Sequence, residues 1–278
     1  MTTPRVLPKT VGYLLPYILI STFQYQIAQD SLKYSSPFLL MALRFLIASL
    51  LLFAVIRSFR LIVNKDTVLL SLLTCASSGF WIVGLEYVST GESSVLSYAM
   101  PLMSIPLASL ILSERASHRE WVGAGVGFLG VLVYSSVLFE NRNLSVLGAV
   151  LTLLNALFWG IYTIYYRKLK NQEATTTVAT QLLFGAFFFL LITPFGYRVQ
   201  LTLNFWFDLA YLSILSAAVS FLLWNALARI NRVGKMTTLI YLTPVAVTLV
   251  QYAETSILPP PAALIGLCLM IFGIYVSR

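Results

Sequence analysis

The sequence predicts an all-α integral membrane protein with ten transmembrane helices in two inverted five-helix repeats. Three observations predict it: an apolar composition, ten apolar segments of spanning length, and a repeat within the chain. Of the 278 residues, 59% are hydrophobic and 10% are charged, and the mean hydropathy is +0.86. Soluble domains are roughly 45–50% apolar and about 25% charged. We therefore expect the chain to lie in a lipid bilayer.

Apolar segments recur along the chain at a length of about 20 residues, which suffices for a helix to cross a bilayer. The linkers between them leave no room for a separate soluble domain. Each half, residues 10–139 and residues 146–277, is therefore predicted to be one five-helix repeat. The expected helices lie near 10–29, 35–56, 67–88, 91–113, 119–139, 146–167, 176–195, 205–227, 233–254 and 260–277.

The second half repeats part of the first, about residues 75–134, at a constant offset of 143 positions. Internal repeats of this length decide the architecture of a chain. In an apolar chain, two homologous halves are typical of a transporter fold with its site between the halves. The identical pairs are Ser77 and Ser220, Trp81 and Trp224, Gly91 and Gly234, Tyr98 and Tyr241, Pro101 and Pro244, Ser113 and Ser256, Gly123 and Gly266, and Gly130 and Gly273.

Lysine and arginine are distributed unevenly between the predicted linkers. With the N-terminus in the cytoplasm, 14 fall on the cytoplasmic side and 3 on the other. Cytoplasmic loops carry such an excess, so both termini are predicted to be cytoplasmic and the second repeat to be inverted. The net charge of +8 is thus a topology signal, and we expect no nucleic-acid partner. The cytoplasmic set is Arg5, Lys9, Arg57, Arg60, Lys65, Arg115, Arg119, Arg167, Lys168, Lys170, Arg229, Arg232, Lys235 and Arg278, and the opposite set is Lys33, Arg142 and Arg198.

Polar and aromatic residues share faces of several expected helices. Ser77 lies four residues before Trp81, and Asn155 lies four before Trp159. Mixed faces of this kind turn away from lipid, so we expect them to line a central cavity; the alternative is hydrogen bonding between helices. The candidate cavity residues are Gln24, Ser77, Trp81, Ser94, Tyr98, Asn155, Trp159, Tyr162, Trp224 and Tyr241.

For three kinds of residue within the spans, the sequence leaves two possible roles open. The amides of Gln24 and Asn155 bond either a substrate or another helix, because an unsatisfied amide costs several kcal/mol in an apolar medium. Arg44 is the charge placed well inside a span, at a cost of roughly 2.5–3.5 kcal/mol. It is either an anchor for a carboxylate or phosphate or a structural group that bonds backbone carbonyls. Pro101 and Pro244 permit kinks that serve as gates or remain static bends.

Glycines recur on the segments 119–139 and 260–277. Gly123, Gly127 and Gly130 follow three- and four-residue spacing, and two of them have repeat partners. Small residues on one face let helices approach closely. We therefore expect these two helices to pair within the chain or to form a homodimer.

Several motifs resemble those of a known family. The segment SPFLLMALRF holds Pro37 and Arg44, and the fourth segment has small residues, Pro101 and then Ser-Glu-Arg at 113–115. The segment LNALFWGIYTIYYRKL opens the second half with Trp159. In these respects the chain resembles the drug/metabolite transporter superfamily, in its EamA-type branch.

The resemblance implies a carrier in the cell (plasma or inner) membrane that exports small metabolites by alternating access. Exporters of aromatic and other amino acids, of the YddG type, look most similar; the alternatives are export of lipophilic cations or drugs, or of a nucleotide or sugar derivative. An intramembrane enzyme is disfavoured, and a membrane scaffold that does not transport is a further alternative, which a tight and dry interior would support. No cofactor or metal is expected, because the sequence has no phosphate-binding loop and no His/Cys cluster.

Overall fold

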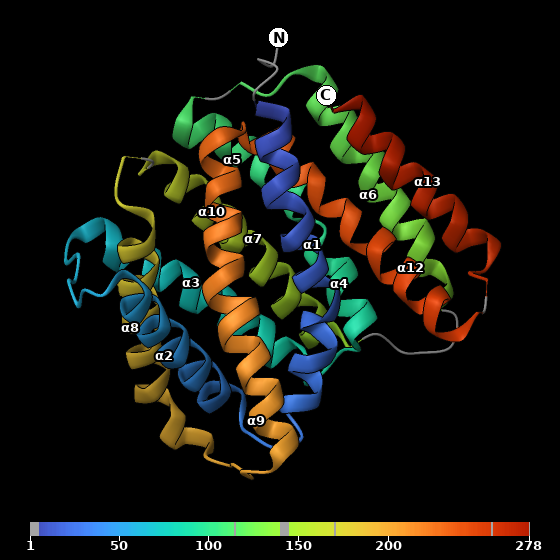
Figure 1. The fold of residues 1–278 in the computed structure, drawn as a ribbon. Helices are drawn as coiled ribbons and strands as arrows, with labels where there is room; N and C mark the ends of the chain where they lie inside the picture. The colour runs from blue at the N-terminus through green and yellow to red at the C-terminus, as the bar shows by residue number, and fades with distance from the viewer. Residues whose placement is uncertain (1–5, 114, 140–144, 170, 257, 278) are drawn as a thin grey trace.

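The computed structural model describes residues 6–113, 115–139, 145–169, 171–256 and 258–277 as a bundle of helices (Figure 1). Within these ranges no β-strand is present, and one isolated antiparallel bridge joins Ser35 to Val199. Several residues that entered the charge count or the motifs lie outside the described ranges, namely Arg5, Glu114, Arg142, Lys170 and Arg278.

The helices begin and end within a few residues of the expected segments. The bounds are α1 Val6–Ser31, α2 Pro37–Ile56, α3 Lys65–Gly84, α4 Thr90–Ser97, α5 Met100–Leu112, α6 His118–Phe139, α7 Val146–Lys168, α8 Ala174–Ile192, α9 Leu203–Ala210, α10 Ser220–Ile230, α11 Val233–Thr238, α12 Leu242–Thr255 and α13 Pro261–Val276. Two 3-10 helices, Thr193–Gly196 and Leu239–Tyr241, and a π-helix, Tyr211–Val219, complete the elements of the described residues.

Among the described residues, seven helical segments are long and apolar enough to cross a membrane by length and composition. Helices α1, α6 and α13 are not among them, and α13 is apolar but has 16 residues. The seven segments are Pro37–Ile56, Lys65–Gly84, Thr90–Leu112, Val146–Lys168, Ala174–Ile192, Leu203–Ile230 and Val233–Val250.

Two expected helices are broken at positions related by the repeat. Helix α4 ends at Ser97 and α5 starts at Met100, immediately before Pro101. In the second half, a 3-10 turn that ends at Tyr241 separates α11 from α12, just before Pro244. A proline has no N–H to continue the helix and clashes with the preceding turn. Both expected helices are therefore interrupted beside a proline, and a role of these prolines in gating stays a prediction.

A third expected helix contains a wider turn instead of a break. Helix α9 continues into the π-helix Tyr211–Val219, which continues into α10. Backbone hydrogen bonds in a π-helix join residues five apart, instead of the four of an α-helix, and such turns are frequent at functional sites. The 3.6-residue periodicity of the sequence does not predict this change from α-helix to π-helix.

Local capping residues set the start of several helices. The Oδ1 atom of Asn64 accepts from the backbone N–H of Thr67 at 2.8 Å and caps α3. Ser89 and Glu92 form a capping box at α4, in which each side chain bonds the other's backbone N–H. Each pair satisfies N–H groups that have no partner within the helix.

Side-chain contacts bring related helices to the same end of the bundle. At this end, the Thr10 hydroxyl of α1 donates to Asn231 after α10, at 3.3 Å. Arg167 near the end of α7 also donates to the Asn231 carbonyl, and Tyr165 donates to Asp66 at the start of α3. Helix α3 thus begins where its repeat partner α10 ends, so the two run in opposite directions. Figure 1 shows the start of α1 and the end of α13 at one end of the molecule.

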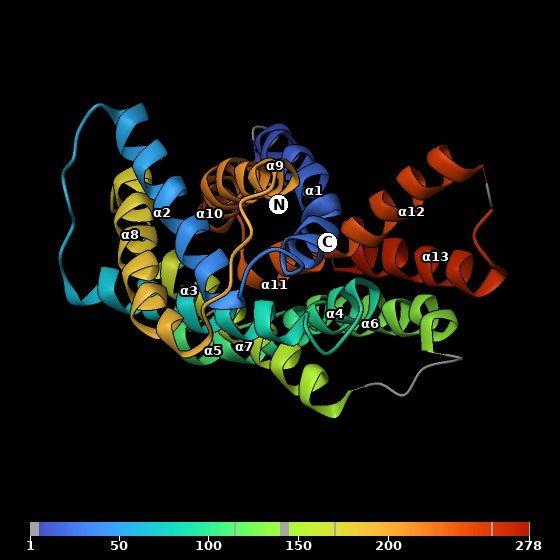
Figure 2. The ribbon, with the colours of Figure 1, turned by 90° about the horizontal axis from the view of Figure 1, so that it is seen from below.

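The packing of the helices repeats the symmetry of the sequence. Helix α3 packs on α7 as α10 packs on α1, and α5 packs on α7 as α12 packs on α1. The pairs α2 with α8 and α6 with α13 each join equivalent helices of the two halves. Figure 2 shows these two pairs on opposite flanks of the molecule, with α1, α7 and α10 between them.

Helices α6 and α13 contact each other backbone to backbone through glycines. A Cβ atom added at Gly266 would lie 2.5 Å from the Tyr134 nitrogen, and one at Gly123 would lie 2.5 Å from the Gly273 carbonyl oxygen. Both distances are too short for real contacts, so only glycine fits. The expected close pairing of these helices occurs within the chain, and a homodimer through them stays a prediction.

This contact predicts a difference between two glycine-to-alanine variants. Gly266→Ala should destabilise the protein by about 1–3 kcal/mol, as overpacking of a dense interface does. Gly125→Ala on α6 is the matched control, because a Cβ there meets nothing within 4 Å. Thermal unfolding of the purified protein in detergent measures both. Equal unfolding temperatures for the two variants would contradict the packing described.

Candidate functional site

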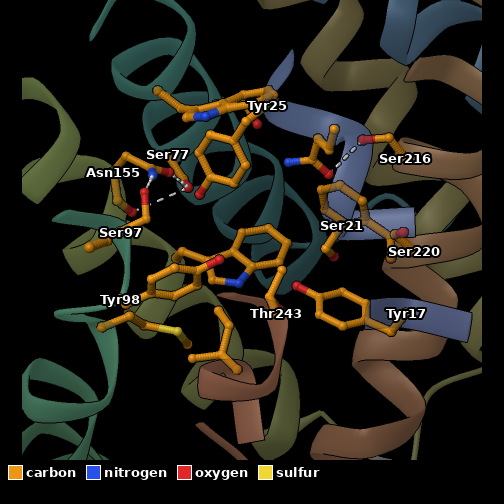
Figure 3. Close-up of a pocket in the computed structure, with 18 of the residues that line it drawn as sticks. Tyr17, Ser21, Tyr25, Ser77, Ser97, Tyr98, Asn155, Ser216, Ser220 and Thr243 are labelled. Atoms are coloured by element: carbon orange, nitrogen blue, oxygen red, sulfur yellow. Dashed lines mark hydrogen bonds between the residues drawn. The ribbon is translucent and has the colours of Figure 1, made fainter. Parts of the chain in front are cut away.

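A cavity lies at the centre of the bundle between α1, α3, α7 and α10 (Figure 3). The space open to the centre of a water molecule is about 90 Å³, against about 10–15 Å³ for a single water. The cavity therefore has room for several waters or a small organic molecule. Its lining residues are Tyr17, Ser21, Gln24, Tyr25, Arg44, Ser77, Ser78, Trp81, Ser97, Tyr98, Met100, Asn155, Ala156, Trp159, Ser216, Ser220, Phe221, Ile240 and Thr243.

The two proline-associated breaks and the π-helix border this cavity. Tyr98 and Met100 flank the break between α4 and α5, and Ile240 and Thr243 flank the equivalent break in the second half. The π-helix contributes Ser216. Within a membrane, irregular backbone is tolerated where it is buried in protein or borders a water-filled space. The breaks and the cavity are therefore parts of one feature.

One side of the cavity is built from neutral polar groups. The Ser77 hydroxyl donates to Asn155 Oδ1 at 2.8 Å, and Asn155 Nδ2 donates to the Ser97 hydroxyl at 3.2 Å. These bonds tie α7 to α3 and α4, and Figure 3 shows the three residues together. Asn155 therefore bonds other helices and also borders the cavity, so both of its expected roles fit its position. We call these three residues the amide cluster.

The opposite side is built around Arg44. Its Nε atom donates to the Leu212 carbonyl at 3.1 Å, and its Nη2 atom donates to the Ser216 carbonyl at 3.1 Å and to the Ser216 hydroxyl at 2.9 Å. The Ser216 hydroxyl in turn donates to Gln24 Oε1 at 2.6 Å. The guanidinium carbon lies 5.3 Å from the centroid of the Trp81 ring. The structural role expected for Arg44 is present, and the side chain also lines the cavity.

Two buried donors beside Arg44 have no partner among the described residues. They are the indole N–H of Trp81 and the hydroxyl of Ser220, one turn after Ser216. Both residues are 4% exposed and line the cavity. We call Gln24, Arg44, Trp81, Ser216 and Ser220 the arginine corner.

Aromatic rings form the walls between these two polar sides. Tyr25 meets Trp81 edge to face with ring centroids 5.6 Å apart, and Trp159 meets Phe221 in the same way at 5.2 Å. Edge-to-face pairs stabilise each other and hold the rings in place. The walls suit the apolar part of an amphipathic molecule.

The cavity is closed at the end where α7 and α10 finish. Beyond its lining residues, the Tyr162 hydroxyl donates to Asn225 Oδ1 at 3.0 Å and accepts from Gln181 Nε2 at 3.1 Å. The Trp224 indole donates to the Thr163 hydroxyl at 2.8 Å. These side chains are fully or almost fully buried. They separate the cavity from the end of the bundle that holds Arg167 and Arg229.

The structure brings most of the expected cavity residues together. Those that line the cavity are Gln24, Arg44, Ser77, Trp81, Tyr98, Asn155 and Trp159.

Four expected residues lie outside the cavity lining. Tyr162 and Trp224 belong to the closed layer just described, and the Tyr241 hydroxyl donates to the Ala124 carbonyl on α6 at 3.0 Å. The Ser94 hydroxyl donates to the carbonyl of Gly91 within its own helix. Helical spacing identifies residues that share a face of a helix, but it does not indicate how far along that helix the cavity extends.

The sequence identified Gln24 on α1 but not the three other residues of this helix that line the cavity. Tyr17, Ser21 and Tyr25 follow four-residue spacing and share a face of α1 with Gln24, so a signal was present. No identity between the two repeats marks these three positions. Within the described residues, no group of three or more His, Cys, Asp or Glu side chains could hold a metal ion.

Comparison with known proteins defines the class of this fold and cavity. The sequence model described as the EamA-like transporter family matches residues 10–136 and 146–278. A protein of Acidianus ambivalens, described as an uncharacterized transporter, is 41% identical over 238 residues, which cover 86% of this chain and 92% of that protein. The chain is therefore a multi-pass membrane transporter. It belongs to the EamA-like transporter family, within the drug/metabolite transporter superfamily, whose members are transporters and not enzymes.

Two further matches are more distant. A protein of Streptantibioticus cattleyicolor, described as a "Probable terminal-alkyne amino-acid exporter", is 28% identical over 199 residues, covering 69% of this chain and 65% of that protein. A solved crystal structure matches with a TM-score of 0.82 at 21% identity, covering 97% of this chain and 96% of that one. At this identity the second match shows the fold alone.

The aromatic wall yields a prediction for Trp159. Trp159→Ala should lower uptake of a transported substrate into proteoliposomes by roughly tenfold, because a ring that packs against a ligand contributes on the order of 1 kcal/mol or more. Trp121→Ala is the matched control, since that indole lies on α6 and is 43% exposed. Unchanged uptake by folded Trp159→Ala protein would remove this residue from the binding site.

Proposed function

We propose that this chain exports small metabolites, chiefly amino acids including aromatic ones, by alternating access across the cell membrane. The observation that carries the proposal is a central cavity with a cationic corner, a neutral amide cluster and aromatic walls between them. An amino acid has an anionic group, a cationic group and a side chain, and these three surfaces complement them. The amino-acid exporter among the distant relatives supports the same substrate class.

Export of lipophilic cations is the rival proposal. A cation would favour a carboxylate in the cavity, and the lining residues include no Asp or Glu. The charged residue that does line the cavity is Arg44, which repels a cation. The same lack of acids in the lining disfavours proton coupling through the cavity, because proton transport within a membrane normally uses a titratable group there. Downhill movement or exchange is the mechanism that we propose.

Ten membrane spans with both termini in the cytoplasm are part of this proposal. In addition to the seven segments above, helices α1, α6 and α13 would also cross the bilayer. The 14-to-3 distribution of Lys and Arg supports this orientation, as does the gathering of Arg167 and Arg229 at one end of the bundle. One repeat would then rock against the other around the cavity.

Labelling of introduced thiols tests the orientation. In a background with Cys75 and Cys268 replaced by alanine, the Lys33→Cys variant should react with an impermeant maleimide on intact cells. The Lys168→Cys variant should react only after permeabilisation, because these exposed residues lie at opposite ends of the bundle. The reverse pattern would show that the chain is inserted the other way.

Transport by reconstituted protein tests the substrate class. Uptake of a panel of radiolabelled amino acids into proteoliposomes should exceed that into empty liposomes, with aromatic members among the best substrates. Because the cavity lining lacks acids, an imposed pH gradient should change the rate little. Uptake of lipophilic cations without uptake of any amino acid would favour the rival proposal.

A further inference from the structure

We propose that the arginine corner binds the carboxylate of the transported molecule, so that the carrier selects acids over the matching amides and amines. This inference rests on the proposed transport function and specifies what the cavity recognises. It assigns Arg44 a second role besides its bonds to the π-helix. It also assigns a role to the unpartnered donors Trp81 and Ser220.

The first argument is the uncompensated charge of Arg44. Its side chain is 3% exposed, and among the described residues no carboxylate lies within ion-pair distance of it. Backbone carbonyls and the Ser216 hydroxyl occupy Nε and Nη2, whereas Nη1 meets only the Met41 sulfur at 3.6 Å. A thioether is a weak acceptor. A buried guanidinium in this state attracts an anion strongly, because the low dielectric around it screens the charge little.

The second argument is the direction of the hydrogen bonds that spread from Arg44. A guanidinium can only donate, so the Ser216 hydroxyl accepts from Arg44 and gives its own hydrogen to Gln24 Oε1. One of the two acceptor sites of the Gln24 amide oxygen is thereby used. Its amide nitrogen is left as a further donor in the lining of the cavity. The relay therefore adds a donor to those of Arg44 at this side of the cavity.

The third argument is the pair of buried donors without partners. The Trp81 indole N–H can donate but never accept, and Trp81 packs under the Arg44 guanidinium at 5.3 Å. The Ser220 hydroxyl lies in the same corner. A buried polar group without a partner costs roughly 1–3 kcal/mol. A carboxylate, which has acceptor sites for about four hydrogen bonds, would satisfy these groups together.

The rest of the cavity fits the remainder of such a molecule. Figure 3 shows Ser77, Ser97 and Asn155 on the side opposite Ser216 and Ser220. The hydroxyl and amide oxygens of this amide cluster are acceptors, which an ammonium group requires. A zwitterion can therefore place its carboxylate at the arginine corner with its ammonium group turned toward the amide cluster. A phosphate monoester would use the arginine corner but leave the acceptors on the far side unused.

The experiment compares an acid with its amide. L-phenylalanine and L-leucine are tested against L-phenylalaninamide and L-leucinamide, which lack the carboxylate and keep the side chain and the amine. Two readouts are taken: uptake into proteoliposomes, and the rise in unfolding temperature of the purified protein. The acid of at least one pair should bind on the order of tenfold more tightly than its amide, because hydrogen bonds to charged groups are the strong ones.

Three variants locate the selection. Ser220→Ala and Trp81→Phe should each weaken binding of the acid by about tenfold and binding of the amide by less, because the amide carbonyl is an uncharged acceptor, so the acid-to-amide ratio falls. Ser220→Ala removes a hydroxyl without a partner, so the free protein should be no less stable than the native one. Ser213→Ala is the matched control, because that hydroxyl is also buried and unpartnered but lies outside the cavity lining. Arg44 is left intact because it also holds the π-helix.

Each result separates this inference from the proposed function. Equal binding of acid and amide, with uptake of both, would overturn the carboxylate site and leave amino-acid transport standing. An acid-to-amide ratio unchanged by Ser220→Ala and Trp81→Phe would also overturn the arginine corner as that site. If neither acids nor amides bind or enter the proteoliposomes, amino-acid transport itself fails and the inference fails with it.

Discussion

A guanidinium buried among apolar helices must be solvated by the protein, and the way this chain solvates Arg44 organises the centre of the molecule. The acceptors are carbonyls at Leu212 and Ser216, within the π-helix Tyr211–Val219. The wider turn of a π-helix leaves some carbonyls less completely used by the helix itself. These carbonyls can therefore accept hydrogen bonds from the buried Arg44 side chain. Through Ser216 the same charge also positions Gln24 of α1. Three helices thus meet at one charge on the wall of the cavity.

Most of the fold was predictable because its determinants are local or periodic. Apolar length defines the helices, the 143-residue offset relates the two halves, and proline locates the breaks near Tyr98 and Tyr241. The π-helix was not predictable, since nothing in its composition departs from an ordinary apolar helix. The spans beyond the seven apolar segments, and the orientation in the membrane, still rest on the distribution of charge.

The site was predictable in part, for a related reason. Spacing of four residues finds side chains on one helical face, and Trp159 and Asn155, chosen in this way, lie in the cavity lining. It does not say how far along the helix the cavity extends, so Tyr162, one turn further, was included too. The repeat also suggested that Trp81 and Trp224 have equivalent surroundings, which the structure does not show. The Trp224 indole has a partner in Thr163, whereas the Trp81 indole has none among the described residues.

The glycine contact between α6 and α13 has a mechanical consequence. Two helices whose backbones touch cannot rotate freely about their axes, because rotation would turn larger side chains into the space that only glycine fits. They also cannot slide easily, since Gly123 and Gly130 must stay opposite Gly273 and Gly266. Helices α6 and α13 therefore form a rigid unit that contains one helix from each half. A conformational change that opens the cavity to one side or the other would then have to come from the helices outside this α6–α13 pair.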